Sequence, residues 1–277
     1  MKVLHVLQAQ PTQDGDGVNI RRVAGFDGRY LDPFLMLDEL KSDDRKDYMG
    51  GFPPHPHRGI ETFTYLIKGG FEHRDHLGNQ KAIRSGDVQW MSTGRGVIHS
   101  EMPLAESEGL HGFQIWINMP SAEKMRPPRY QDSTSAPLPV IENGTGARLR
   151  ALGGSWQAVE QVAESPLNNL AADAALADVE LQPGGRLDLA PLHQSKVMVY
   201  IHTGSLAQGQ YKAGDLLILE PGSDIALSSE QGGGALILAG EPLQQPIAHM
   251  GPFVMTTQEE LMQAVRDYQA GRFGTIE

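Results

Sequence analysis

Two short stretches of sequence decide how the rest of the chain is interpreted. Residues 50–61 read Gly-Gly-Phe-Pro-Pro-His-Pro-His-Arg-Gly-Ile-Glu, and residues 94–103 read Gly-Arg-Gly-Val-Ile-His-Ser-Glu-Met-Pro. Alternate residues of an extended strand point to the same side, so His55 and His57 project together, and the His-Ser-Glu triplet repeats this spacing. Two such pairs on neighbouring strands would offer three imidazoles and a carboxylate to one divalent ion. The predicted metal ligands are His55, His57, His99 and Glu101.

Histidine pairs of this kind need support from their surroundings. A lone His-x-His motif is more often a surface pair or a hydrogen-bonded core pair than a metal site. Here the first pair is surrounded by Pro53, Pro54 and Pro56, which remove backbone donors and suit the end of a strand. The second pair follows Gly94 and Gly96, which let the backbone bend or approach another segment closely. Two pairs with such neighbours favour a metal site.

The composition is that of a turn-rich globular protein. The chain has 277 residues, enough for two domains at roughly 150 residues each. It contains 40% hydrophobic residues, 32 glycines and 18 prolines, too many chain breakers for a helix bundle. Cysteine is absent, so disulfides, zinc-thiolate sites and thiol catalysis are excluded, and metal binding must use nitrogen and oxygen ligands. An all-β fold fits best.

The charge and the N-terminus restrict the classes of partner. A formal net charge of −11 argues against direct binding of nucleic acid, which needs clustered Lys and Arg for its phosphates. The first six residues, Met-Lys-Val-Leu-His-Val, begin like a strand and lack the apolar run of a signal peptide. Apolar segments long enough to cross a bilayer are missing. We therefore expect no membrane association and a cytoplasmic location.

Short strand-like runs separated by glycine turns fill both halves of the chain. Residues 62–67 form a β-branched and aromatic run that ends at a Gly-Gly turn. Similar runs return at residues 215–219 and 235–238. The Ser-Gly-Asp turn at 85–87 and the Ala-Gly-Asp turn at 213–215 occupy matching places, which indicates a weak internal repeat. The sequence thus predicts two β modules of the same kind.

The predicted domain organisation follows from this repeat. Residues 1–130 form the metal-binding domain, 131–146 the linker, 147–250 a second domain, and 251–277 a helix and tail. The second domain lacks the histidine and carboxylate pairs, so we expect it to be metal-free and to stabilise the protein or bind a partner. The helix is expected to begin at Thr257, which can form a capping box with the glutamate three residues later.

Several motifs resemble the pirin family. They are Phe-Pro-Pro-His-Pro-His-Arg-Gly-Ile-Glu-Thr at 52–62, Gln-Trp-Met-Ser-Thr-Gly-Arg-Gly-Val-Ile-His-Ser-Glu-Met-Pro at 89–103 and His-Gly-Phe-Gln at 111–114. The Leu-Asp-Pro-Phe-Leu-Met-Leu-Asp segment at 31–38 and Gly-Pro-Phe at 251–253 are also similar to pirins. The resemblance implies a bicupin, with two antiparallel β-barrels in tandem and one metal ion, usually iron, in the N-terminal barrel.

The carboxylate ligand has two candidates. Glu61 has the same strand parity as His55 and His57, and cupins outside the pirin group often take their carboxylate from this place. Parity cannot separate Glu61 from Glu101. The resemblance favours Glu101 as the ligand and leaves Glu61 as a supporting or structural carboxylate. Such a ligand set suits Fe(II), and also Mn(II), Ni(II), Co(II), Cu(II) or Zn(II).

The resemblance implies an oxygenase of the quercetin 2,3-dioxygenase type. Four protein ligands leave one or two positions open on an ion that prefers five or six, so a flavonol or related aromatic enol could bind together with dioxygen. Glu101 or Glu61 would accept the proton of the substrate hydroxyl. Side chains near the ligand strands would form the substrate pocket: Phe52, Ile60, Met91, Ile98, Gln114 and Trp116.

A different class of function stays open beside this one. Some pirins act as regulatory partners of transcription factors and metabolic enzymes, with the oxidation state of the metal changing a surface. The acidic net charge permits a protein partner of this kind. A metal-free sugar epimerase or a storage cupin is less consistent with four intact ligands.

Overall fold

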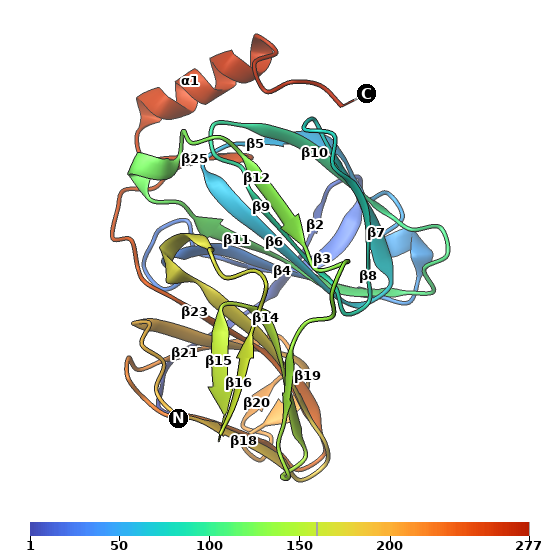
Figure 1. Cartoon of the computed structure of the whole chain (residues 1–277), viewed down its shortest axis with the longest axis vertical. Coiled ribbons are helices and arrows are strands. Elements are labelled where there is room, and N and C mark those ends of the chain that lie inside the picture. The colour runs from blue at the N-terminus through green and yellow to red at the C-terminus, as the bar shows by residue number, and fades with distance from the viewer. Residues whose placement is uncertain (159, 277) are drawn as a thin grey trace. The chain divides into compact units, whose positions relative to one another are not determined.

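The chain folds into two compact units built from antiparallel strands (Figure 1). The computed structural model describes residues 1–158 and 160–276. Residues 11–137 and 243–277 form one unit, which we call the histidine barrel, and residues 1–10 and 138–242 form the other, the apolar barrel. The predicted all-β fold with a C-terminal helix is confirmed.

Two sheets make up the histidine barrel. The larger has seven strands in the order β12-β9-β6-β11-β4-β3-β2, and the smaller has four in the order β5-β10-β7-β8. A short β24–β25 hairpin and helix α1 complete the unit. The strands and the helix are β2 (Gln10–Asp14), β3 (Val18–Ala24), β4 (Phe34–Ser42), β5 (Phe52–His57), β6 (Ile60–Lys68), β7 (Gly70–Asp75), β8 (Gln80–Arg84), β9 (Val88–Ser92), β10 (Val97–Pro103), β11 (Leu110–Asn118), β12 (Arg129–Asp132), β24 (Ala248–Met250), β25 (Phe253–Met255) and α1 (Gln258–Gln269).

The apolar barrel is built around one large sheet. Its strands follow the order β1-β21-β19-β23-β17-β14-β13, with β20 paired to β19, and two separate pairs, β15–β16 and β18–β22, accompany it. The strands are β1 (Val3–Gln8), β13 (Val140–Glu142), β14 (Ala147–Gly153), β15 (Ser155–Ala158), β16 (Gln161–Glu164), β17 (Ala175–Leu181), β18 (Gly185–Leu189), β19 (Lys196–Leu206), β20 (Tyr211–Lys212), β21 (Asp215–Leu219), β22 (Ile225–Ser229) and β23 (Gly233–Gly240).

The structure divides the chain differently from the predicted boundaries at both ends. The first ten residues lie in the apolar barrel, because β1 pairs antiparallel with β21 from Val3 opposite Leu219 to Gln8 opposite Asp215. The last segment, from Leu243 onward, lies in the histidine barrel. Between them the chain crosses after Pro137, inside the predicted linker. Strand pairing between sequence-distant segments leaves no local signal, which is why the sequence did not reveal this exchange of termini.

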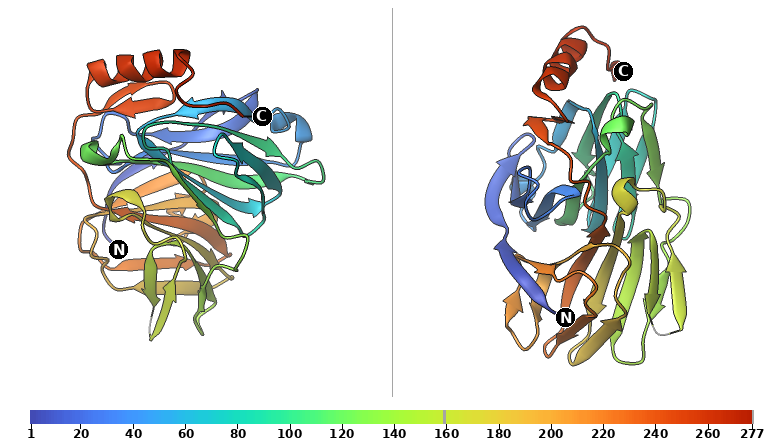
Figure 2. Two further views of the ribbon diagram at one scale, coloured as in Figure 1. Left: turned by 45° about the horizontal axis from the view of Figure 1, so that its top comes forward. Right: turned by 90° about the vertical axis from the view of Figure 1, so that its left-hand side faces the viewer.

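Helix α1 forms as its sequence predicts. The Thr257 side chain accepts the backbone N–H of Glu260 at 3.2 Å, and the Glu260 carboxylate accepts the N–H of Thr257 at 3.0 Å, which makes the predicted capping box. Leu261 and the buried Ala264 pack with Phe253 of the hairpin. Two further views show α1 lying along the β24–β25 hairpin (Figure 2).

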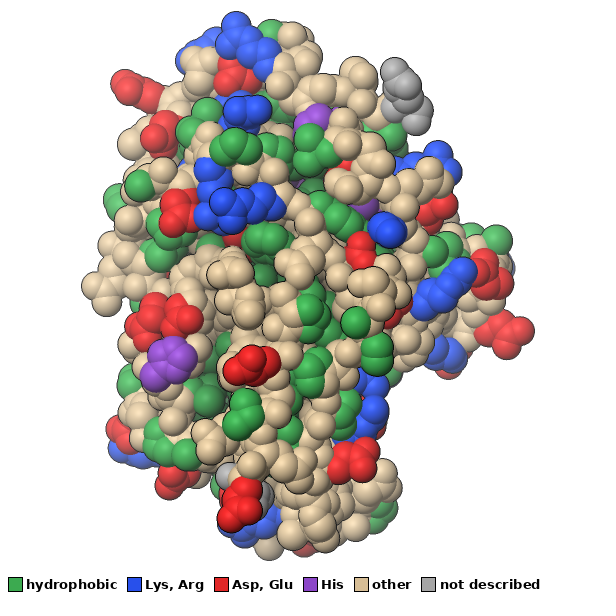
Figure 3. All heavy atoms as spheres, viewed as in Figure 1, with side chains coloured by type: hydrophobic (Ala, Val, Ile, Leu, Met, Phe, Trp, Pro, Cys, Tyr) green, Lys and Arg blue, Asp and Glu red, His purple; other side chains and the backbone are tan. Residues whose placement is uncertain are grey.

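Charged side chains of both signs are interspersed over the face of the molecule shown in Figure 3, without a continuous basic stripe on that face. Among the described residues, no helix combines the length and apolar character needed to span a membrane.

Candidate metal centre

The two predicted ligand pairs, His55 with His57 and His99 with Glu101, lie on adjacent strands, as expected. Strands β5 and β10 pair antiparallel, with His99 directly opposite His55 and Val97 opposite His57. A change of register between His99 and Glu101 places Glu101 opposite Phe52. Cross-strand partners have side chains close enough for contact, so the pairing alone brings the imidazoles together.

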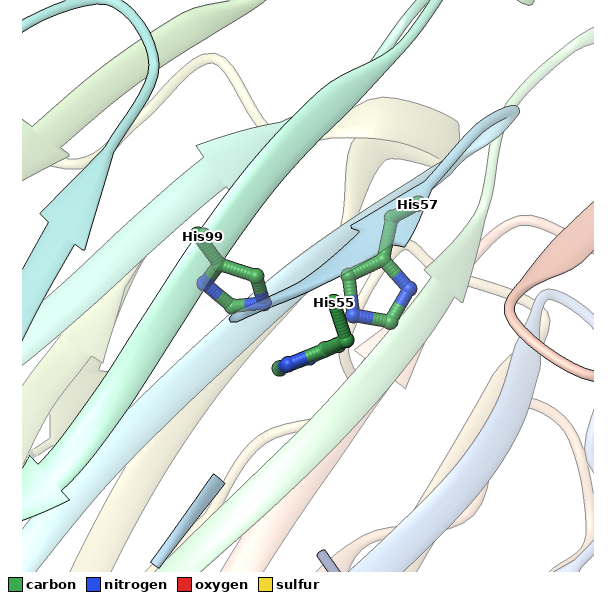
Figure 4. A group of neighbouring side chains, drawn as sticks. All are labelled: His55, His57 and His99. Carbon is green, nitrogen blue, oxygen red and sulfur yellow. The ribbon is translucent and has the colours of Figure 1, made fainter. Parts of the chain in front are cut away.

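The three imidazole rings face one another at short range (Figure 4). Ring centroids are 4.4 Å apart for His55 and His99, 4.8 Å for His55 and His57, and 5.0 Å for His57 and His99. One ligand nitrogen from each ring lies within 4.8 Å of the others. His57 and His99 are buried and His55 is half-buried, so the cluster is open on the side of His55.

His99 carries two buried nitrogens that the protein itself does not satisfy. Neither Nδ1 nor Nε2 has a hydrogen-bond partner within the described part of the chain. A buried polar atom without a partner costs about 1–3 kcal/mol, so its presence calls for a ligand. Burial, together with the neighbouring imidazoles, holds the pKa of His99 well below its usual range. The ring is therefore neutral at pH 7, the form that donates a lone pair to a metal.

His57 is oriented by the C-terminal hairpin segment. Its Nδ1 lies 3.3 Å from the carbonyl oxygen of Pro252, which suits an Nδ1–H donor and leaves Nε2 for a ligand. Burial and the nearby His55 hold the pKa of His57 well below its usual range. Gly59, with φ +81°, follows in a turn where a Cβ atom would lie 2.1 Å from the Val254 carbonyl oxygen. Only glycine fits this position, which brings the hairpin against the ligand strand.

Glu101 is surrounded by neutral polar groups. Its Oε1 accepts the Gln89 amide at 3.2 Å, and its Oε2 accepts the Gln114 amide at 3.2 Å. The single hydroxyl hydrogen of Thr64 is shared between Oε1 of Glu101 at 3.0 Å and Oε1 of Gln114 at 2.7 Å. Amide N–H groups can only donate, so this arrangement suits an ionised carboxylate. A carboxylate oxygen of Glu101 also lies within 4.8 Å of ligand nitrogens of His73 and His99.

His73 was missed in the sequence, although it faces the cluster from β7. It lies opposite Glu101 in the β10–β7 ladder and is fully buried. Its Nε2 is 3.2 Å from Oδ2 of Asp75, while Nδ1 has no partner among residues 1–158 and 160–276. The His-Arg-Asp triplet at 73–75 has the same i, i+2 spacing as the predicted pairs, so this signal could have been used.

Glu61 lies away from the histidines. It is the second residue of β6, which follows the Gly59 turn, so the parity that it shares with His55 and His57 does not place it on their side. Its carboxylate accepts the Trp90 indole N–H and pairs with Arg126, each at 2.9 Å. Thr64, which contacts Glu101, is three residues further along the same strand and therefore points to the opposite face. These contacts favour a structural role for Glu61.

A cavity of about 540 Å³ opens over the cluster, within the usual size range of small-molecule sites. Of the predicted pocket residues, Phe52, Gln114 and Trp116 line it together with His55, His57 and Glu101. Ile60, Met91 and Ile98 lie outside the described lining: Ile60 packs with Leu35 and Val254, Met91 is fully buried, and Ile98 packs against the α1 cluster. Nearness in sequence to the ligands did not predict which way these side chains point.

The paired barrels and the histidine cluster inside one of them define a bicupin. Models of the pirin family and of the pirin C-terminal cupin domain match residues 17–117 and 176–274. A Vibrio cholerae protein whose name proposes quercetin 2,3-dioxygenase activity is 45% identical over 276 residues, or 99% of this chain and 98% of that protein. Human pirin is 32% identical over 283 residues, which cover 99% and 94% of the two chains. The chain belongs to the pirin family.

A solved structure gives the same picture of the fold. Quercetin 2,3-dioxygenase from Acinetobacter baumannii superimposes with a TM-score of 0.88 at 30% sequence identity, covering 100% of this chain and 99% of that one. The predicted family and the bicupin fold are thereby confirmed.

Proposed function

We propose that this pirin is a metal-dependent dioxygenase of the quercetin 2,3-dioxygenase type, with Fe(II) as its ion. The observation that carries the proposal is the pair of unpartnered nitrogens on buried His99, where three imidazoles converge beneath a cavity. The names of the Vibrio cholerae and Acinetobacter baumannii relatives support the choice of reaction.

The residues present fit a divalent ion of the iron type. The structure holds two overlapping groups of possible ligands, one of His55, His57 and His99 and one of His73, His99 and Glu101. His55, His57, His99 and Glu101 would hold the ion if Glu101 joins the first group through the shared His99, and these nitrogen and oxygen donors suit a first-row metal. When bound, such an ion stabilises the anionic oxygen of an enol substrate and brings dioxygen next to it. His73 and Asp75 support this ligand set from β7, because a histidine held by a carboxylate keeps a fixed ring orientation.

Glu101 is the group that would receive the substrate proton. It lines the cavity and sits beside the imidazoles, whereas Glu61 is engaged on the other face of the sheet. The donors Thr64, Gln89 and Gln114 keep its carboxylate directed toward the cavity. A flavonol 3-hydroxyl placed there would lose its proton to Glu101.

The cavity walls would hold a flat aromatic substrate. The Trp116 ring stands edge-on to His57, with centroids 5.1 Å apart, and Phe52 closes another part of the lining. Aromatic walls of this kind exclude water and fix the ring plane of the substrate. In the overall reaction one flavonol and one dioxygen give an ester of two hydroxybenzoic-type rings and one carbon monoxide.

The test uses protein loaded with Fe(II) without oxygen. Quercetin is added, then air-saturated buffer, and oxygen uptake and carbon monoxide release are measured together. We expect one carbon monoxide for each dioxygen consumed, and no release from His99→Ala treated in the same way. Iron-loaded wild type that binds quercetin yet neither consumes oxygen nor releases carbon monoxide contradicts the proposal.

A further inference from the structure

A row of polar side chains runs across the seven-stranded sheet from Glu101 to the far end of the cavity. Its members are cross-strand partners: Thr64 pairs with Gln114, Gln114 with Asp38, and Asp38 with Arg22. Partners in a sheet carry their side chains on the same face, so the row follows the cavity floor. Arg22 lies two strands beyond Gln114, roughly 10 Å away at the usual strand spacing.

The far end of this row is a clamped guanidinium. Arg22 donates from Nε to Oδ1 of Asp38 at 2.8 Å and from Nη2 to Oδ2 at 2.7 Å, and its Nη2 also pairs with Asp14. All three residues line the cavity. The Asp38 side chain is 6% exposed, that of Arg22 27% and that of Asp14 47%, so Asp14 is the member most open to a ligand.

The charge of this cluster selects the kind of group that can bind. Two carboxylates and one guanidinium leave a net negative charge, so carboxylate or phosphate groups are repelled. Each carboxylate oxygen of Asp14 has two lone pairs and accepts one hydrogen bond, Oδ1 from the Gly15 N–H and Oδ2 from Arg22, which leaves capacity for another. Hydrogen-bond donors, neutral hydroxyls among them, are the groups that these oxygens would accept.

Aromatic side chains belong to the same cavity lining. Phe26 stacks on His249 with centroids 3.8 Å apart and ring planes 4° from parallel. The Trp116 ring stands edge-on to Phe26 at 6.1 Å. Burial lowers the pKa of His249, which keeps its ring neutral beside Phe26. The cavity lining thus contains predicted metal ligands, the carboxylate acceptors Asp14 and Asp38, and aromatic side chains.

We propose that Asp14, Arg22 and Asp38 form a recognition site for the hydroxylated outer ring of a neutral polyphenol. The substrates of the protein would then be flavonols that carry adjacent hydroxyls on the pendant ring. The pendant ring is attached next to the carbon that carries the reacting hydroxyl, so this inference rests on the proposed function for the placement of that hydroxyl at the metal ligands. Asp14 determines specificity here and takes no part in the bond changes.

The experiment compares two flavonols that differ at the pendant ring. Quercetin has two adjacent hydroxyls there, and galangin has none. Each is titrated into Fe(II)-loaded protein without oxygen, and the quenching of tryptophan fluorescence gives Kd. We expect wild type to bind quercetin about tenfold more tightly than galangin. Asp14→Asn, which removes the charge but keeps the shape, should weaken quercetin binding about fivefold and leave galangin unchanged.

A matched control is Asp43→Asn. The Asp43 side chain is 87% exposed, pairs with Lys68 in the same barrel and lies outside the cavity lining. Neither flavonol should change in affinity with this variant. Arg22→Lys gives a second test, because lysine cannot hold both carboxylates through a planar fork. It should reduce the preference for quercetin as well.

Two results would overturn the recognition site: equal affinity of wild type for both flavonols, or equal weakening of both by Asp14→Asn. Admitting oxygen to the same samples separates this inference from the proposed reaction. Discrimination without oxygen uptake supports the recognition site and removes the dioxygenase. Oxygen uptake without discrimination supports the dioxygenase and removes the recognition site.

Discussion

The two barrels share a strand architecture and differ in what fills them. The apolar barrel encloses a large cluster of buried apolar side chains, among them Leu149, Trp156, Ile201 and Leu217. In the histidine barrel an apolar cluster that includes Leu40, Leu66 and Phe71 lies in the same unit as a cavity lined by the buried polar side chains of Asp38, His57 and Glu101. Fold alone therefore does not create a site, because the inward-facing residues decide whether a barrel holds a core or a ligand.

Buried histidines with a carboxylate partner occur in both barrels, and His202 and His73 show the difference sharply. In the apolar barrel His202 uses both nitrogens, with Nε2 3.0 Å from Asp178 and Nδ1 3.0 Å from the Thr203 hydroxyl. In the histidine barrel Nδ1 of His73 has no partner within the described residues and faces the cluster. Both ring nitrogens of His202 thus have hydrogen-bond partners, whereas Nδ1 of His73 is left for a ligand.

The largest effect is expected from removing the central imidazole. His99→Ala should weaken Fe(II) binding at least a thousandfold. The His99 ring belongs both to the group with His55 and His57 and to the group with His73 and Glu101, so its loss leaves the ion with a poor donor set. Metal content after dialysis, measured by elemental analysis, checks this. His202→Ala in the apolar barrel is the control and should keep its metal. Equal metal content in the two variants would break the comparison.

The next effect concerns stability. Lys124 is 2% exposed, and its Nζ donates to Gly59 O at 2.7 Å, Asn118 Oδ1 at 2.6 Å and Val254 O at 3.0 Å. Lys124→Met leaves these acceptors without a donor and should lower the free energy of unfolding by about 3 kcal/mol in urea titrations.

The matched control for this variant is Lys68→Met. Lys68 is half-exposed and pairs with an exposed aspartate on the same barrel, so its replacement should leave the free energy of unfolding nearly unchanged. A similar, small loss for both lysine variants would show that the buried lysine does not tie the C-terminal hairpin to the turn after the ligand strand.

A smaller effect is expected from the histidine that the sequence did not reveal. His73→Gln should weaken Fe(II) binding about tenfold, because it removes the imidazole that Asp75 orients beside His99 and Glu101. Competition with a chelator of known affinity measures this. His202→Gln, which alters the paired histidine of the apolar barrel, should leave the affinity unchanged. If His73→Gln binds iron as wild type does, the two pairs are equivalent.

The smallest effect is a pH dependence in helix α1. Burial opposes ionisation of Asp267, but hydrogen bonds from Arg58 and Gln263 outweigh it and lower its pKa. A lowered carboxyl pKa contributes stability above the unfolded value of about 3.9, and this is lost as pH falls through the folded value. Between pH 5 and pH 3, wild type should lose about 1 kcal/mol more unfolding free energy than Asp267→Asn. Equal losses in urea titrations at the two pH values would show that this ion pair does not stabilise the helix.

The sequence predicted much of this molecule because its signals were local. Alternating histidines, glycine turns and the capping box at Thr257 each act within a few residues, and the structure places them as expected. The exchange of termini, the position of Glu61 and the role of His73 depend on which strands pair and which face a residue takes after a turn. Those relations are set by long-range packing, which the order of residues does not display.

The central claim is that His55, His57, His99 and Glu101 hold one ion in the histidine barrel. Diffraction from crystals of the iron-loaded protein, collected at the iron absorption edge, tests it most directly. The account predicts one anomalous peak within bonding distance of the three imidazoles and Glu101. A peak in the apolar barrel, or iron-loaded crystals without a peak among these imidazoles, would contradict it.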